Sequence, residues 1–162
     1  MFNGTTVEGS REERYQAALT QLQGLIMDEP SAIANLSNAS ALLNLTLQDI
    51  NWAGFYLYDG KELVLGPFQG LPACIRIPLG RGVCGTAAEQ RTTVLVEDVH
   101  AFPGHIACDA ASNSEIVVPM VKDGELLGVL DIDSPLKGRF DEVEQGFLEQ
   151  FVEILVKDLM LP

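Results

Sequence analysis

The N-terminal part of the chain carries apolar residues at the spacing of an α-helix. The residues from Ser10 to Glu13 have the capping-box form, in which a hydroxyl group and a carboxylate satisfy free backbone donors at a helix start. The apolar positions that then share one helical face are Tyr15, Ala18, Leu19, Leu22, Leu25 and Ile26. Pro30 and Ser31 open a second helix with its own apolar stripe. We expect residues 1–9, which precede the first helix, to be a flexible N-terminus.

The middle of the chain changes to patterns that predict strands. Residues 50–58 are rich in aromatic side chains, Asp59-Gly60 is a hairpin turn signal, and residues 63–68 form the return strand. A third strand is expected over residues 73–79. These segments therefore predict antiparallel neighbours.

The second half of the chain continues with short elements and one long hairpin. Residues 82–90 predict a short helix and residues 94–96 a short strand, whereas residues 100–114 have little periodicity and predict a loop or an irregular short helix. The clearest hairpin joins residues 116–121 to residues 126–132. Asp141 caps a closing helix. The core face of that helix consists of Val143, Phe147, Phe151, Ile154 and Leu155.

The order of these elements predicts the fold class. Two helices, a series of hairpin-connected strands and a last helix are typical of an α+β domain, here with an antiparallel sheet flanked by N-terminal and C-terminal helices. A length of 162 residues suits one domain over residues 1–162. A domain of this size buries enough surface to fold without a disulfide or a metal ion.

Composition and charge limit the classes of partner that we expect this protein to bind. The formal net charge of −13 repels phosphate backbones and anionic lipids, so neither nucleic acid nor a membrane is an expected partner. The N-terminus has no basic region ahead of an apolar stretch and no apolar run is long enough to span a bilayer, which together predict a cytoplasmic protein. The sequence leaves the oligomeric state open, and a homodimer is compatible with it. Three cysteines are an odd number, which argues against a structural disulfide framework.

Cys108 lies in a polar stretch of small residues that runs from His105 to Glu115. Loops of this kind often carry reactive groups, because a rigid scaffold holds them within reach of solvent and ligand. A thiol reacts as its thiolate, which His105 and the free backbone N–H groups of the loop would stabilise. Asp109 and Glu115 would oppose the thiolate unless they bind substrate or are protonated. From these residues alone, a reactive thiol and a buried, inert thiol are equally good interpretations of Cys108.

Cys74 and Cys84 do not form a Cys-x-x-Cys pair, and for each one taken singly a packed core thiol is the favoured interpretation. Together with Cys108 they would supply a nucleophile and a resolving thiol. Zinc is a competing hypothesis, since His105 and Cys108 have the spacing of metal ligands and His100 is close by. Structural zinc sites usually show two close ligand pairs, and only one is present here, so no metal is expected.

Acidic and aromatic residues share strand faces. Glu115 precedes the first strand of the clearest hairpin, and Asp131 and Asp133, two residues apart, point to the same side of the second. Spacing alone favours solvated acids, with a pocket that holds an ammonium group or delivers a proton as the alternative. Trp52 and Tyr56 also share a strand face, for which core packing is favoured over a pocket wall.

Several blocks of the sequence resemble the free methionine-(R)-sulfoxide reductases. The most specific block runs from Asp98 to Pro119 and contains Cys108. The other blocks are NWAGFYL at 51–57, LGPFQGLPACIRIP at 65–78, GRGVCGTAA at 80–88 and LDIDS at 130–134. The resemblance extends over nearly the whole chain and implies a GAF fold.

The resemblance also implies roles for individual residues. Cys108 matches the catalytic cysteine of that family, Cys74 the main resolving cysteine and Cys84 an auxiliary one. The positions that match its substrate pocket are Trp52, Tyr56, Glu115, Asp131 and Asp133. The implied reaction has no cofactor and no metal.

The implied chemistry is consistent with these residue types. The thiolate of Cys108 attacks the sulfur of free methionine sulfoxide while Glu115 or Asp133 protonates the oxygen, which leaves methionine and a sulfenic acid. Cys74 then condenses with Cys108 to form a disulfide that thioredoxin reduces. Selection of the free amino acid and of the R epimer follows from the resemblance alone.

Two other functions are compatible with the sequence. A GAF sensory module would bind a small ligand without turnover, although such modules are usually tethered to an output domain and have no use for three cysteines in these blocks. A redox switch would use Cys74 and Cys108 as a regulatory disulfide. Oxidation of NADPH in the presence of thioredoxin, thioredoxin reductase and free methionine sulfoxide separates the enzyme from both.

Overall fold

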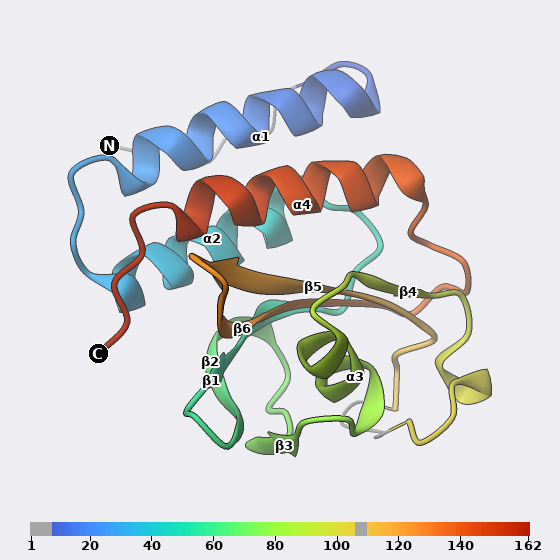
Figure 1. Cartoon of the computed structure of the whole chain (residues 1–162). Coiled ribbons are helices and arrows are strands. Elements are labelled where there is room, and N and C mark those ends of the chain that lie inside the picture. Colours follow the sequence, from blue (N-terminus) through green and yellow to red (C-terminus); the bar gives the residue numbers. More distant parts are fainter. Residues whose placement is uncertain (1–7, 106–109) are drawn as a thin grey trace.

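One antiparallel sheet of six strands organises the molecule, with the strand order β3-β2-β1-β6-β5-β4 (Figure 1). The structure is a computed structural model that describes residues 8–105 and 110–162. The strands are β1 Trp52–Tyr58, β2 Glu62–Gly70, β3 Arg76–Pro78, β4 Val94–Val96, β5 Ser114–Lys122 and β6 Glu125–Ser134. The helices are α1 Arg11–Ile26, α2 Ala32–Thr46, α3 Gly82–Gln90, α4 Glu142–Val156 and the short 3₁₀ turn η1 Val99–Ala101. The α+β class predicted from the sequence is confirmed.

The helix starts follow from their capping residues. Ser10 and Glu13 form the predicted capping box at the start of α1, and the Ser31 side chain accepts a hydrogen bond from the backbone N–H of Ala34 at the start of α2. Asp141 accepts from two backbone N–H groups of α4. Residues 1–7, part of the N-terminus that we expected to be flexible, lie outside the described residues.

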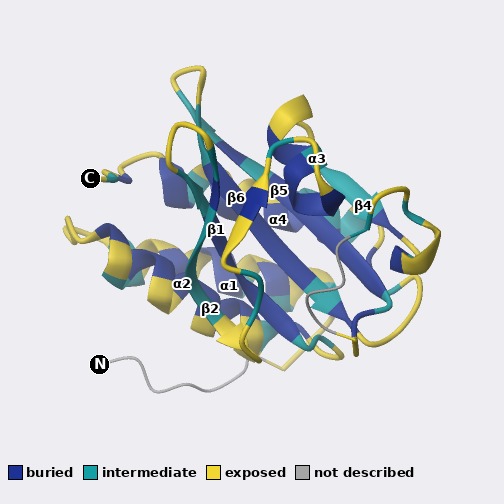
Figure 2. Cartoon of the chain, turned by 90° about the horizontal axis from the view of Figure 1, so that it is seen from below, coloured by how far each residue is buried: buried dark blue, intermediate teal, exposed yellow. Residues whose placement is uncertain are grey.

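The sheet separates two layers of unequal size. Helices α1, α2 and α4 cover one face, whereas α3 lies on the opposite face (Figure 1). The larger core, between the three helices and the sheet, contains Leu22, Phe55, Leu130 and Phe151, which are almost completely buried. The strands at the centre of the sheet are buried along most of their length, and exposed residues gather on the outer faces of the helices (Figure 2). None of the described helices is long and apolar enough to cross a membrane.

An ion-pair network ties the helical layer together. The carboxylate of Glu144, on α4, accepts hydrogen bonds from Arg11 of α1 at 2.9 Å and from Arg139 at 2.7 Å. Arg139 also donates to the backbone carbonyl oxygen of Gln48. Glu144 is only 1% exposed, so the two guanidinium groups compensate a charge that would otherwise be costly to bury.

The predicted strand over residues 73–79 is shorter in the structure, where β3 covers only Arg76–Pro78. Pro72 lacks a backbone N–H to pair with a neighbouring strand, and side chains of β1 bind carbonyl oxygens of the segment instead. Residues 71–75 therefore form a connecting segment beside the sheet. The region predicted as a loop or irregular helix over 100–114 contains the turn η1 and the first residue of β5, and its residues 106–109 lie outside the described part of the chain.

Candidate functional site

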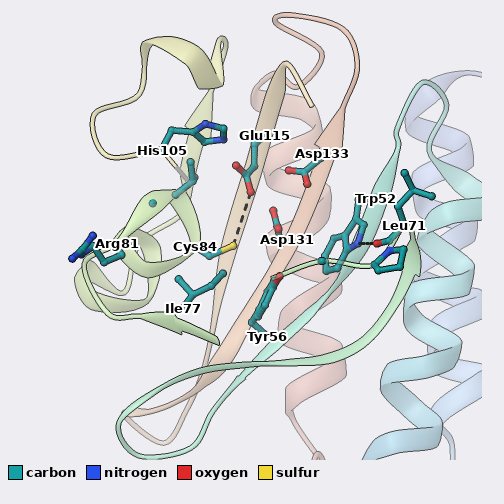
Figure 3. Close-up of a pocket in the computed structure, with 14 residues that line it drawn as sticks. Trp52, Tyr56, Leu71, Ile77, Arg81, Cys84, His105, Glu115, Asp131 and Asp133 are labelled. Carbon is teal, nitrogen blue, oxygen red and sulfur yellow. Dashed lines mark hydrogen bonds between the residues drawn. The ribbon is translucent and has the colours of Figure 1, made fainter. Parts of the chain in front are cut away.

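The side chains predicted for the site lie on the face of the sheet that α3 covers (Figure 3). Successive residues of a strand point to opposite faces, so Trp52 and Tyr56 face the site while Ala53 and Phe55 enter the larger core. The same alternation turns Glu115 of β5 toward the site. Strand alternation thus explains how one sheet supplies both an apolar core and a polar pocket.

The register of three neighbouring strands brings these residues together. Asp133 of β6 lies directly opposite Trp52 of β1 on one side and opposite Glu115 of β5 on the other. Asp131 lies two residues earlier on β6 and therefore faces the same way. These residues surround a pocket with about 540 Å³ of empty space, including its open mouth. Its other walls include Leu71, Pro72, Ile77, Val83 and His105.

Two of the three acids of the pocket are buried, so the solvated interpretation that the spacing of Asp131 and Asp133 favoured is wrong for Asp131. Glu115 and Asp131 are only 7% and 5% exposed, and Asp133 is half-buried. The sequence pattern did not reveal that α3 covers this face of the sheet. Asp131 Oδ1 has no hydrogen-bond partner among the described residues, which leaves an acceptor available to a ligand.

Burial and mutual repulsion shift the protonation of these acids. Burial, followed by the neighbouring charges of Asp131 and Asp133, raises the pKa of Glu115 well above its ordinary value. Burial also raises the pKa of Asp131, but hydrogen bonds from Glu115, Cys84 and Asp133 oppose that rise. Of the two acids, Glu115 therefore holds its proton to higher pH, and Asp131 is more readily ionised. A pocket of this kind suits a ligand that carries a positive charge.

Cys84 is a buried, free thiol within this acid group. Its Sγ atom lies 3.9 Å from Glu115 Oε2, which is within hydrogen-bond distance for sulfur. Burial, followed by the charges of Asp131 and Glu115, raises the pKa of Cys84 well above its ordinary value. The thiol is therefore protonated at neutral pH and is a poor nucleophile.

Aromatic side chains form a continuous wall on the β1 side of the pocket. Trp52 stacks on Tyr56 with ring centroids 5.8 Å apart and on Phe68 at 5.1 Å. Gly54 permits this arrangement, because a Cβ atom there would lie 2.2 Å from the Cβ atom of Phe68. Phe68 was not singled out in the sequence, although a glycine between two aromatic residues on one strand face was a usable signal for a close approach.

The same aromatic residues hold the segment that carries Cys74. Trp52 Nε1 donates a hydrogen bond to the Leu71 carbonyl oxygen at 3.1 Å, and the Tyr56 hydroxyl donates to the Cys74 carbonyl oxygen at 2.9 Å. Burial and the nearby acids raise the pKa of Tyr56, so its hydroxyl remains a donor. Trp52 and Tyr56 are almost fully buried, which satisfies the core interpretation and the pocket interpretation at once.

The cysteines differ in state and exposure. Cys84 is buried, as expected for a packed thiol, whereas Cys74 is half-buried and disulfide-bonded, so the core-thiol interpretation is wrong for Cys74. Cys108 and Asp109 lie outside the described residues. The predicted role of Cys108 therefore remains a prediction from the sequence.

The histidines and the acid group both carry side chains of types that bind metal ions. His105 lines the pocket, and burial, followed by the charge of His100, lowers its pKa, so it is a neutral imidazole at neutral pH. Cys84, Glu115 and Asp131 each offer one atom within 4.8 Å of the others. Within the described part of the chain no fourth side chain completes that group, and hydrogen bonds already link its members. We assign no metal ligand there.

Comparison with known proteins shows which family this chain resembles in sequence and structure. A model of the GAF domain family matches residues 39–156. The free methionine-R-sulfoxide reductase of Escherichia coli is 56% identical over 93% of this chain and 91% of its own length. The structure of fRMsr of Staphylococcus aureus in complex with substrate has a TM-score of 0.87 and 54% identity, covering 96% of this chain and 100% of that chain. The free methionine-R-sulfoxide reductase of Neisseria meningitidis, also in complex with its substrate, has a TM-score of 0.91 and 45% identity, covering 95% of this chain and 93% of that chain.

The fold and the enclosed site thus define a GAF domain, and the chain belongs to the GAF domain family. Its identity to named relatives over nearly the full length of both chains is far higher than fold similarity alone requires. Within the GAF domains the chain belongs to the free methionine-R-sulfoxide reductase family. The resemblance described from the sequence is confirmed.

Proposed function

We propose that this protein reduces free methionine-(R)-sulfoxide to methionine. The observation that supports the proposal most directly is the pocket, in which buried acids face an aromatic wall. Free methionine sulfoxide has a charged ammonium group, a polar sulfoxide and an apolar methyl group. The pocket presents Asp131, Glu115 and Trp52, which match these three features in charge and polarity.

Substrate binding is argued from this match. Asp131 pairs with the ammonium group, because its unpartnered Oδ1 atom is buried in the pocket and accepts an N–H donor. The indole ring of Trp52 covers the methyl group beside the sulfoxide sulfur. Peptide-bound methionine sulfoxide has an amide in place of the ammonium group unless it is N-terminal. An enclosed acid pocket therefore favours the free amino acid.

The first chemical step transfers the sulfoxide oxygen. The thiolate of Cys108 attacks the sulfoxide sulfur while Glu115 donates its proton to the oxygen, with Asp133 orienting the sulfoxide. The oxygen ends on Cys108 as a sulfenic acid and methionine is released. The substrate sulfur gains two electrons and the cysteine sulfur loses them. The raised pKa of Glu115 supports its role as the proton donor at neutral pH.

The second step restores the thiol. The Cys74 thiol attacks the sulfenic acid of Cys108, a water molecule leaves, and a disulfide forms. A dithiol reductant such as thioredoxin then attacks this disulfide, leaves as its own disulfide and returns both cysteines to thiols. The disulfide at Cys74 in this structure, beside a free Cys84, supports the choice of Cys74 as the resolving residue.

A count of methionine molecules tests this proposal. The reduced wild-type protein, mixed with the separated R epimer and no reductant, should release about one methionine per subunit, and Cys108→Ser should release none. Cys74→Ser should also release about one methionine but should then stop, because thioredoxin reduces disulfides and this variant cannot form the disulfide.

Three outcomes would contradict parts of the proposal. Full thioredoxin-driven turnover by Cys74→Ser would assign the resolving role to another thiol, and Cys84→Ser is the matched control for that case. Methionine release by Cys108→Ser would remove Cys108 from the first step. A wild-type protein that releases no methionine from either epimer would be a ligand-binding or redox-sensing GAF domain.

A further inference from the structure

The segment that carries Cys74 exposes large apolar side chains to solvent. Leu71 and Ile75 are 64% and 67% exposed, and the half-buried Cys74 lies between them in the sequence. Pro72 is exposed as well. Exposed apolar side chains that gather in one place forgo the free energy of burial, and such clusters mark interaction sites. We call Leu71, Pro72 and Ile75 the apolar rim of Cys74.

Hydrogen bonds hold the backbone of this segment beside the sheet. The side chain of Trp52 donates to the carbonyl oxygen of Leu71 (Figure 3). Tyr56 donates to the carbonyl oxygen of Cys74, and the backbone N–H of Leu65 donates to that of the following residue, at 2.8 Å. The rim is therefore presented by a fixed backbone, so a partner that binds it does not have to order the segment first.

The stretch of chain around the rim is free of acidic residues. The chain has 23 of them, yet none lies between Leu63 and Ala88. The charged residues of this stretch are Arg76 and Arg81, and both are exposed. The centres of protein interfaces are depleted in charged residues, because an unpaired charge is costly to bury. The composition of this stretch therefore suits contact with another protein.

The state of Cys74 indicates what kind of partner the rim receives. Cys74 is disulfide-bonded in this structure. A disulfide is reduced when a thiolate bonds to one sulfur and displaces the other, so the reductant must make contact at the disulfide itself. A protein reductant then also covers the residues that flank the sulfur. Redox encounters between proteins bury less than about 1,200 Å² in total, so a small apolar rim is in proportion to them.

We propose that the apolar rim is the docking surface for a protein dithiol that reduces the disulfide by attack on Cys74. The reductant thiolate bonds to Cys74 Sγ, the disulfide bond breaks, and the partner cysteine leaves as a thiolate that takes up a proton. The second thiol of the reductant then attacks its own mixed disulfide, and Cys74 leaves as a thiolate. The dithiol supplies both electrons and becomes a disulfide. The proposal rests on the proposed function for the origin of the disulfide, but docking can be measured without any sulfoxide.

Other exposed apolar residues do not offer an equivalent surface. Met27 and Met160 are exposed and line a cavity at the end of α4, together with Asp28 and Asp158. Among the described residues, no cysteine lines that cavity. Ile33 is 71% exposed on α2, which covers the face of the sheet opposite the pocket. Ile33 is thus a matched control for Ile75, with the same side chain and nearly the same exposure.

The test compares Ile75→Asp with Ile33→Asp. Ile75 is exposed and is not among the residues that line the pocket, so its replacement should leave the fold and the release of methionine in a single turnover unchanged. The disulfide is formed with a chemical oxidant such as diamide, and its reduction by thioredoxin is followed as loss of NADPH with thioredoxin reductase in excess. Ile75→Asp should lower kcat/KM for this reduction by about tenfold, because it sets a charge against an apolar partner surface.

Three controls make that result specific to docking. Ile33→Asp should be reduced by thioredoxin at the wild-type rate. Ile75→Met, which keeps an apolar side chain, should also be reduced at that rate. Dithiothreitol should reduce the wild type and all variants equally, because a small dithiol needs no docking surface. Equal rates for Ile75→Asp and the wild type with thioredoxin would overturn the proposal, and so would equal slowing of Ile75→Asp with dithiothreitol.

Trapping identifies the sulfur that is attacked. A thioredoxin variant without its second cysteine cannot resolve the mixed disulfide, and peptide mass spectrometry should find it bonded to Cys74. A mixed disulfide on another cysteine would overturn the proposal, as would a wild-type disulfide that dithiothreitol reduces and thioredoxin does not. Reduction by thioredoxin that depends on Ile75, in a protein that releases no methionine, would keep this inference and reject the proposed function.

Discussion

The molecule contains two deeply buried glutamates whose surroundings are opposite. Glu144, in the helical layer, is 1% exposed and is paired with Arg11 and Arg139. Glu115, under α3, is 7% exposed and is surrounded by acids and a thiol. Burial raises the pKa of both residues. At Glu144 the neighbouring Asp141 adds to the rise and the two arginines oppose it, whereas at Glu115 both Asp131 and Asp133 add to it.

This difference separates a structural charge from a functional one. The charge of Glu144 is compensated inside the fold, so the helical layer is complete without a ligand. Neither Glu115 nor Asp131 forms an ion pair with an arginine or lysine among the described residues, and a cationic ligand would relieve the repulsion between them. Buried acids without a cationic partner are costly to the fold, which makes them a physical indicator of a binding site.

Replacing Glu115 should have the largest effect on activity. Glu115→Gln removes the proposed proton donor while it keeps the size of the side chain, so the rate of the first step should fall by a factor of about 10² to 10⁴. The rate is measured as methionine release in a single turnover. An unchanged rate would show that another group protonates the sulfoxide. The matched control is Glu149→Gln, which makes the same change on the exposed surface of α4.

The equivalent change at Glu144 should affect stability instead. Glu144→Gln leaves Arg11 and Arg139 without their shared partner, and we expect a loss of about 2–4 kcal/mol in the free energy of unfolding, less than for a fully enclosed pair because Arg11 is partly exposed. Urea unfolding measures this loss. The folded variant should reduce the sulfoxide at the wild-type rate. A lower rate of reduction without any loss of stability would contradict the structural role assigned to Glu144.

Asp131→Asn should weaken substrate binding more than it slows the chemistry. A hydrogen bond to a charged group contributes about 1.5–3 kcal/mol, so the loss of its charge should raise KM by about 10- to 100-fold. Calorimetric titration with methionine, the product, gives the same comparison without turnover. If Asp131→Asn binds as tightly as the wild type, the ammonium group is held elsewhere.

The smallest expected effect is the contribution of Glu115 to the pH dependence of stability. Because the pKa of Glu115 is raised in the folded state, its contribution to stability is complete below the ordinary value of 4.5 and is lost as the pH rises toward the raised value. Glu115→Gln cannot ionise, so its Tm relative to that of the wild type should increase as the pH is raised from about 5 to about 9. A constant difference in Tm over that range would show that Glu115 ionises without cost.

Much of the fold could be predicted because its signals are local. The capping residues at Ser10, Ser31 and Asp141 fix three helix starts, and the clearest hairpin predicts the pairing that later places Glu115 opposite Asp133. These features depend on neighbouring residues in the sequence, so a single chain is sufficient to find them.

The site was less predictable because its character depends on what covers the sheet. Spacing placed Asp131 and Asp133 on one face, but only the packing of α3 against that face makes Asp131 a buried acid. The roles of the cysteines came from the family resemblance and not from their positions. Phe68 was missed because its contact with Trp52 depends on the pairing of β1 with β2, and the register of that pairing shifts between Gly54 and Tyr56.

The hydrogen bonds from Trp52 and Tyr56 to the Cys74 segment have a consequence for how this enzyme can be altered. Both residues face the substrate pocket, yet both also fix the backbone next to the cysteine that is proposed to regenerate it. The two half-reactions are therefore not independent modules. A substitution chosen to admit a larger sulfoxide will also loosen the recycling segment, so redesign of specificity requires compensating changes in residues 71–75.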